Sequence, residues 1–271
     1  MSQAKDMRKA LFGALRIYLV YILTPGFLMM VGMMLRRTDM TSEQFFAESG
    51  NFYTVVGFTL ALLLIRRRCR KKGLSFTEEA SLSVRNVNWK KGLGLLGAGI
   101  GLSLFVSSVL TLLPDSWMAG YTDSSESIFK GPDQILAVLG VTFAAPVMEE
   151  MIFRGFILNR LLKGFSDAAA VVITAVLFSL LHVNPIWILY SFLLGILLGH
   201  FAMQEENTLY PILLHVGFNV LSIPLNIMNH IESAREVLFQ SPLLIVLYGM
   251  IGLCAAVLLL RKYYKKEEPL W

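Results

Sequence analysis

The sequence predicts an all-α membrane protein with about eight transmembrane helices. Hydrophobic residues occupy 55% of the 271 positions and charged residues only 16%, and the mean hydropathy is +0.62. A soluble domain of this size has too little interior to bury so many apolar side chains, whereas a lipid bilayer accommodates them. The apolar residues also gather into runs of about 20 residues, the length of helix that crosses the hydrocarbon core. Both observations indicate a polytopic membrane protein.

Eight apolar runs follow one another along the chain. The first comes after Lys5, Arg8 and Lys9, as in a signal peptide, but it is too long and lacks a small-residue cleavage site, so we interpret it as a retained anchor. Polar segments at 120–130 and 229–241 are predicted to be loops. With no repeat or linker, we expect a single transmembrane domain over 1–271. The runs cover residues 11–35, 45–65, 93–113, 134–161, 168–184, 185–203, 209–228 and 242–260.

The basic residues predict the orientation. If the N-terminus is cytoplasmic, the cytoplasmic segments hold 18 lysines and arginines and the outer segments hold four, which places both termini in the cytoplasm of a protein integral to the cell membrane. The basic run 66–72 is interpreted as a topology anchor, with a specific lipid or partner site as the alternative. Because the basic residues lie at the ends of apolar runs, the net charge of +5 does not indicate a nucleic-acid partner.

A glycine-rich stretch opens the third run. Residues 92–97 match the dinucleotide-binding pattern G-x-G-x-x-G, but that pattern requires a preceding strand, and here a membrane span begins. Gly97 and Gly101 instead form a G-x-x-x-G spacing, which predicts the close approach of a neighbouring helix.

Two adjacent glutamates, Glu149 and Glu150, lie inside the fourth apolar run, followed by Arg154. A carboxylate in hydrocarbon costs at least ~2.5 kcal/mol, so it persists mainly where it is paired or faces water. Glu150 and Arg154 are four residues apart, so they share a helix face and can neutralise each other. Glu149 lies about 100° around the helix and is left available.

Two histidines follow in later apolar runs. His215 and Asn219 are four residues apart, which places two hydrogen-bond donors side by side, an arrangement suited to an oxyanion. His182 and Glu149 are predicted to lie at similar depths on either side of the turn near Gly164. His215 reaches that depth only if the helices around this turn extend past the membrane surface, in which case the Asn-Pro pair at 184–185 breaks or kinks the chain.

Three patterns therefore stand out in order: Glu149-Glu150-x-x-x-Arg154, Phe178-x-x-x-His182 and His215-x-x-x-Asn219. Together, over about residues 135–225, they resemble the CAAX protease and bacteriocin-processing (CPBP, or Abi) family of intramembrane proteases. The resemblance implies an intramembrane endopeptidase, of glutamate or metalloprotease type. In it Glu149 is the general base that activates water with the help of His182, and His215 and Asn219 stabilise the oxyanion. Glu150 and Arg154 are implied to be supporting residues.

The sequence leaves the cofactor and the substrate open. Glu149, His182 and His215 form a two-histidine, one-carboxylate set like those that hold Zn²⁺ in hydrolases, whereas Asn219 is a poor zinc ligand and favours a glutamate-activated water. The partners expected from the resemblance are the lipid bilayer and a peptide or membrane-anchored protein, such as a prenylated or pheromone-type peptide. The alternative is a non-catalytic scaffold or bacteriocin self-immunity protein. A transporter is less favoured because the sequence shows no repeated halves.

Overall fold

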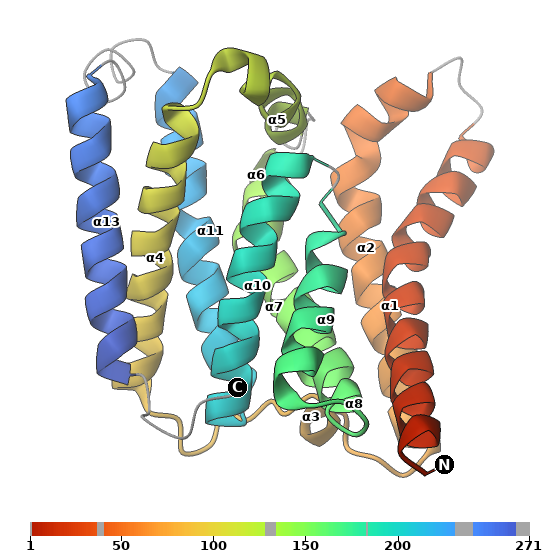
Figure 1. Ribbon diagram of the computed structural model, residues 1–271. Helices are drawn as coiled ribbons and strands as arrows, with labels where there is room; N and C mark the ends of the chain where they lie inside the picture. Colours follow the sequence, from red (N-terminus) through yellow and green to blue (C-terminus); the bar gives the residue numbers. More distant parts are fainter. Residues whose placement is uncertain (1, 37–40, 128–133, 183, 231–240, 264–271) are drawn as a thin grey trace.

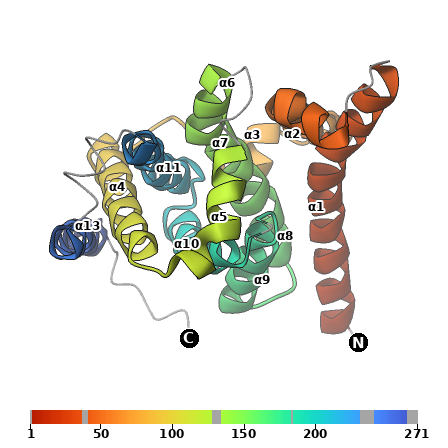
Figure 2. The ribbon, with the colours of Figure 1, turned by 90° about the horizontal axis from the view of Figure 1, so that it is seen from above.

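The computed structural model of the chain describes residues 2–36, 41–127, 134–182, 184–230 and 241–263, and all regular secondary structure in them is helical. Figures 1 and 2 show the helices side by side in one bundle, with α1 and α2 on one side and α4 and α13 on the other. The long helices are α1 (Ser2–Leu35), α2 (Ser42–Lys71), α4 (Trp89–Thr111), α10 (Pro185–Glu205), α11 (Leu209–His230) and α13 (Pro242–Tyr263). The shorter ones are α3 (Phe76–Glu79), α5 (Asp115–Ser127) and α9 (Asp167–Ser179).

All eight predicted runs are helical, but not all are full-length spans. Within the described residues, five helices are long and apolar enough to cross a membrane: α1, α2, α4, α10 and α13. Helix α9 and the apolar part of α11, Leu209–Leu221, are shorter. The run at 134–161 is divided into several helical pieces. The prediction of a helical membrane protein is therefore confirmed, whereas eight complete spans are not established.

The predicted basic segments gather at one end of the bundle. In Figure 1, α1 begins and α13 ends at the lower end, where α2 also ends and α4 begins. The turns after α8 (Asn159–Leu161) and α10 lie at the same end. These helix ends and turns therefore lie at the same end of the bundle. The compartment that this end faces stays a prediction.

Helix α9 ends earlier than predicted. The run 168–184 is helical only as far as Ser179, so His182 lies in a turn and not on a helix. Pro185 disfavours the helical conformation in the residue before it. Asn184 instead caps α10, its Oδ1 accepting the N–H of Ile186 at 2.9 Å. Figure 1 shows α9 ending well short of the level at which α10 begins.

The segment 120–130 is not the predicted loop, because residues up to 127 belong to helix α5. The ring of Tyr121 packs on Trp187 of α10, with the ring centroids 5.6 Å apart. Burial raises the pKa of Tyr121 above its ordinary value, so its hydroxyl remains a donor at neutral pH. This packing favours a helix more strongly than the polar composition of 120–130 favours a loop. The second predicted loop, 229–241, lies almost wholly outside the described residues.

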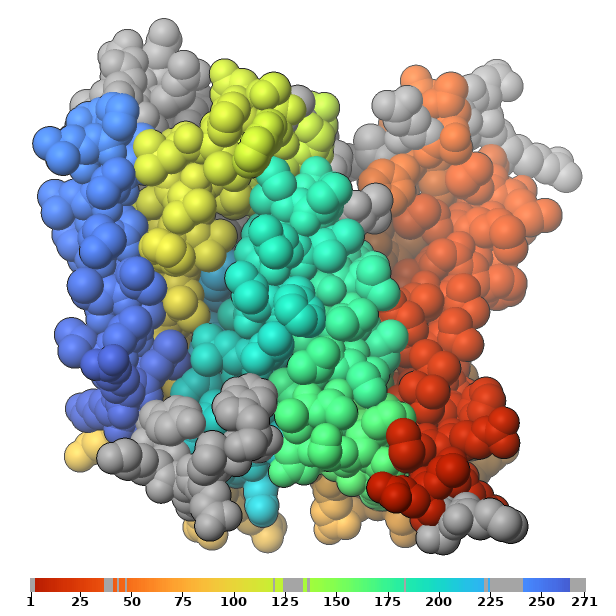
Figure 3. All heavy atoms as spheres, viewed as in Figure 1, coloured from red at the N-terminus to blue at the C-terminus, as the bar shows by residue number. Residues whose placement is uncertain are grey.

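Glycines set the spacing of the helices around α4. A Cβ at Gly97 or Gly101 would meet Leu259 or the carbonyl oxygen of Gly252, both in α13, at 3.2 and 2.6 Å. This confirms the predicted close approach of a neighbouring helix. On another face of α4, a Cβ at Gly217 of α11 would overlap the backbone carbonyl of residue 96. Figure 3 shows α9 and α10 filling one face between this group of helices and α1.

Candidate active site

The segment that carries the two glutamates is an irregular helix. It consists of α6 (Gln134–Leu139), the π-helix η1 (Gly140–Ala144), α7 (Ala145–Glu150), a second π-helix η2 (Met151–Leu158) and α8 (Asn159–Leu161). The N–H of Ala145 donates to the carbonyl of Gly140, five residues back. Short π-helical turns are rare and occur frequently at functional sites. Hydropathy alone could not predict them, because it does not report the hydrogen-bond register.

Pro146 explains the position of Asn219. Proline has no N–H, and in the five-residue register of η1 its missing partner is the carbonyl of Val141. The side-chain amide of Asn219 donates to that carbonyl at 2.9 Å. Asn219 therefore ties α11 to η1 at the point where the proline leaves an acceptor without its backbone donor.

Glu150 is the centre of a buried network. Its Oε1 accepts hydrogen bonds from Arg154 Nη1 and from His215 Nδ1, each at 2.8 Å. The side chains of Glu150 and Arg154 are both 0% exposed, and Arg154 Nη2 donates to the carbonyl of Gly195 in α10 at 3.0 Å. The pairing predicted from the four-residue spacing is confirmed. The bond to His215 joins α7 to α11 and was not predicted.

This network orients the His215 ring toward Glu149. Glu150 faces Arg154 as a carboxylate and can only accept, so Nδ1 of His215 carries the proton and donates. Nε2 is then the atom that faces Glu149, and it lies 3.9 Å from Oε2 of that residue. The separation is too long for a direct hydrogen bond. Glu149 is outside the pair with Arg154, as predicted.

Phe178 is an aromatic platform that sequence reasoning did not assign. The guanidinium of Arg154 lies over its ring, 4.5 Å from the centroid, and the rings of His182 and His215 meet it edge-on at 5.6 and 5.7 Å. His182 also contacts the ring of Trp187 at 5.7 Å. The four-residue spacing of Phe178 and His182 was the available signal. Among the described residues, His182 forms no hydrogen bond or ion pair with a glutamate; Phe178 is what joins it to the site.

The residues do not form a metal site in this arrangement. Across the described part of the chain, no group of three or more His, Cys, Asp and Glu side chains is placed to hold a metal ion. In the predicted set of Glu149, His182 and His215, Nδ1 of His215 is bonded to Glu150, so Nε2 is the nitrogen of that ring that could serve as a ligand. Because the described side chains are not grouped to hold a metal ion, we derive no step through one.

Comparison with known proteins gives one match. Residues 131–221 match the family model of type II CAAX prenyl endopeptidase Rce1-like proteins. No curated protein and no solved structure matches the chain. The matched segment includes Glu149, Glu150, Arg154, the Phe178–His182 pattern and the His215–Asn219 pattern, in the order already described. Over these residues the chain is similar to that family, in agreement with the resemblance to the CAAX protease and bacteriocin-processing family seen in the sequence.

Proposed function

We propose that this protein is an intramembrane endopeptidase that hydrolyses a peptide bond with water activated by Glu149. The observation that carries the proposal is the position of the Glu149 carboxylate. It is left out of the Glu150–Arg154 pair and faces Nε2 of His215 at 3.9 Å. Its side chain is only 13% exposed, and a carboxylate kept in such surroundings normally has a function.

The proposed reaction begins with a water molecule between Glu149 and His215. Glu149 takes a proton from the water, whose oxygen attacks the scissile carbonyl, so that a C–O bond forms and the carbonyl electrons become an oxyanion. His215, with Nδ1–H on Glu150 and a second proton on Nε2, and Asn219 donate hydrogen bonds to that oxyanion. One such donor is typically worth about 10²–10³ in kcat. The oxyanion then collapses, the C–N bond breaks, and Glu149 returns its proton to the leaving amine.

His182 is proposed to assist Glu149 at the water or at the leaving amine. Its place in the turn after α9, held between the rings of Phe178 and Trp187, supports this role. Glu150 and Arg154 are proposed as positioning residues, because both are fully buried and act through His215.

The proposed substrates are membrane-associated peptides or proteins, with prenylated C-terminal peptides as the first class to test. The family description, a CAAX prenyl endopeptidase, supports that choice. We also infer that both termini are cytoplasmic, since the basic segments lie together at the end of the bundle where α1 begins. Reporter fusions to each terminus, active on only one side of the membrane, test this orientation.

The decisive experiment compares peptide termini by mass spectrometry in membranes that contain the wild-type protein, Glu149→Gln or the control Glu78→Gln. Glu78 is exposed in α3, so its variant should cleave as the wild type does. New termini that are present with wild type and Glu78→Gln but lost with Glu149→Gln support the protease. A parallel sample with a chelator tests for metal dependence.

Identical termini from all three folded proteins, with an added prenylated peptide present, would count against catalysis by Glu149. In that case a non-catalytic scaffold or self-immunity function becomes the favoured interpretation. It predicts that Glu149→Gln still binds its partner or protects the cell.

A further inference from the structure

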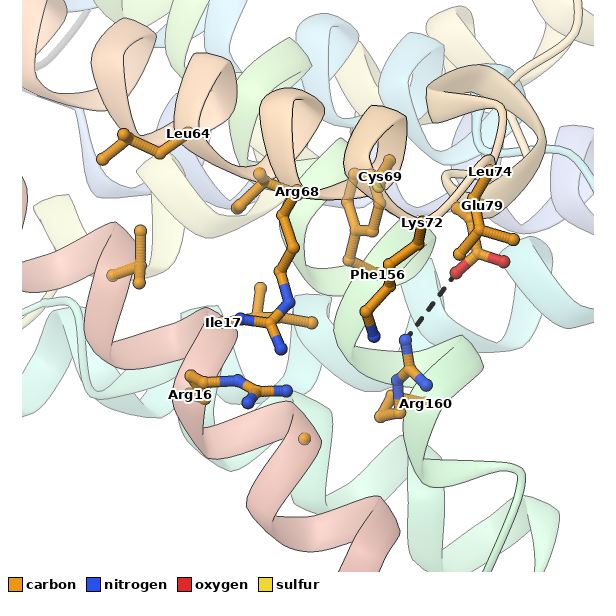
Figure 4. A pocket seen from close by; sticks show the side chains of 13 residues that line it. Arg16, Ile17, Leu64, Arg68, Cys69, Lys72, Leu74, Glu79, Phe156 and Arg160 are labelled. Atoms are coloured by element: carbon orange, nitrogen blue, oxygen red, sulfur yellow. Dashed lines mark ion pairs between the residues drawn. The ribbon is translucent and has the colours of Figure 1, made fainter.

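A second cavity lies between α1 and α2, at the end of the bundle that carries the basic segments (Figure 4). Its volume is about 310 Å³. Ile17 and Val20 of α1 and Leu64 of α2 give it apolar walls, and four cationic side chains lie around it: Arg16, Arg68, Lys72 and Arg160. None of the residues proposed for catalysis lines it. The cavity is therefore a separate feature of the molecule.

The cationic groups converge from three different helices. Figure 4 shows Arg68 and Lys72 of α2 pointing across the cavity toward Arg16 of α1 and Arg160 of α8. The acidic residue beside them is Glu79, which lies 3.7 Å from Arg160. In the described part of the chain, no carboxylate lies within ion-pair distance of Arg16, Arg68 or Lys72. Like charges held close together repel, so an anion placed between them would be bound favourably.

The role of basic residues in membrane topology does not explain why these four side chains meet at one cavity. Orientation in the membrane depends on the number of basic residues near the ends of the spans, not on whether their side chains meet. Arg16 lies outside the basic run 66–72, and Arg160 belongs to a third helix. Gly13 helps to keep the space open, because a Cβ there would come within 3.0 Å of the Arg160 side chain.

The cavity is apolar at its deeper end and charged at the end nearer the helix termini. A bilayer has the same order, with an apolar interior and a charged surface. Leu64, Arg68 and Lys72 follow one another at four-residue steps along one face of α2, from the apolar part of the helix to its end. On α1, Val20 and Ile17 lie deeper in the apolar run than Arg16. An adjoining hollow, lined by Lys5, Arg8, Lys9, Arg16 and Arg160, extends the positive charge outward.

We propose that this cavity binds one anionic phospholipid. Its phosphate would lie among Arg16, Arg68 and Lys72, and the first part of an acyl chain would lie against Ile17 and Leu64. A cluster of basic side chains beside the membrane is the usual means of recognising anionic headgroups. The lipid would bridge α1 and α2 to the catalytic segment through Arg160. The proposal does not depend on the protein being a protease.

The test measures binding of phosphatidylglycerol and of phosphatidylcholine to the full-length protein in detergent by native mass spectrometry. The variant Arg16→Gln/Arg68→Gln/Lys72→Gln removes three charges that face the cavity. The matched control Arg66→Gln/Arg67→Gln/Arg70→Gln removes three charges from the same basic run that face a different hollow on α2. Each basic group near an anionic lipid is worth roughly a five-fold change in affinity. We expect phosphatidylglycerol affinity to fall on the order of 100-fold in the first variant and much less in the control.

Two further measurements distinguish a lipid from a free anion. Leu64→Asn changes an apolar wall without changing the charge, so it should weaken phosphatidylglycerol binding and leave inorganic phosphate binding unchanged. Binding of inorganic phosphate alone, with no preference for phosphatidylglycerol over phosphatidylcholine, would overturn the proposal. An equal loss of phosphatidylglycerol binding in the two triple variants, both with wild-type melting temperatures, would also overturn it. It would show that the total charge matters and the cavity does not.

Discussion

Replacing Glu150 with glutamine should destabilise the protein strongly, because this change removes the charge from the centre of a fully buried network. Glu150 Oε1 accepts two charge-assisted hydrogen bonds at 2.8 Å, and such bonds contribute about 1.5–3 kcal/mol each. The glutamine oxygen can still accept from Arg154, but the guanidinium loses its counter-charge. Removing one partner of a buried ion pair costs about 3–5 kcal/mol. We therefore expect Glu150→Gln to lower the free energy of unfolding by about 3 kcal/mol.

The assay is denaturant-induced unfolding in detergent, with Glu48→Gln as the control. Glu48 pairs with Arg36 at 3.4 Å, but both side chains are more than 40% exposed, and exposed pairs contribute at most about 1 kcal/mol. The double variant Glu150→Gln/Arg154→Met removes both charges, so it should lose about 2 kcal/mol less than the sum of the two single variants. Additive losses, or a cost for Glu150→Gln no larger than that for Glu48→Gln, would refute the reasoning.

Three other changes probe the packing that holds the site together. Gly217→Ala should cost about 1–3 kcal/mol of unfolding free energy, because its Cβ overlaps the α4 backbone. Gly26→Ala, where no atom lies within 4 Å, should cost nothing and serves as its control; equal effects would contradict the close-approach argument. Asn219→Ala should lose about 1 kcal/mol by leaving the partly buried carbonyl of Val141 without its side-chain donor, and adding Pro146→Ala should recover part of that stability by supplying an N–H. If Asn219 also contacts the oxyanion, the double variant will regain stability but not cleavage activity. Recovery of both would show that the role of Asn219 is structural. Phe178→Leu should lower the melting temperature and cost about 2 kcal/mol through loss of the guanidinium contact, measured against wild type by thermal unfolding; an unchanged melting temperature would contradict a role for this contact.

The helical runs could be predicted from sequence because the bilayer imposes the length and the apolar character of each one. The ends of α9 and the existence of α5 could not. Helix α9 stops at Ser179, and the break precedes Pro185 by several residues, so the proline alone does not locate it. Helix α5 forms in a polar segment, where its contact with Trp187 outweighs the turn-forming composition.

The candidate site was predictable where the side chains lie on one helix. The contact between Glu150 and Arg154 follows from their four-residue spacing. The contact between Glu150 and His215 does not, because 65 residues separate them and only the packing of α11 beside the irregular helix brings them together. Gly217 was an unused signal, since a glycine between His215 and Asn219 marks the place where another helix comes close.

The early end of α9 has a consequence for the backbone groups at the end of the helix. A helix that stops within the bundle needs new donors for its last carbonyl groups, because hydrocarbon offers none. Here the N–H groups of Leu180, Leu181 and His182 donate to the carbonyls of Val176, Phe178 and Ser179. Backbone of this kind persists only where protein or water surrounds it. The turn that carries His182 is therefore closed by its own backbone hydrogen bonds, which present the imidazole to the bundle without a continuing helix.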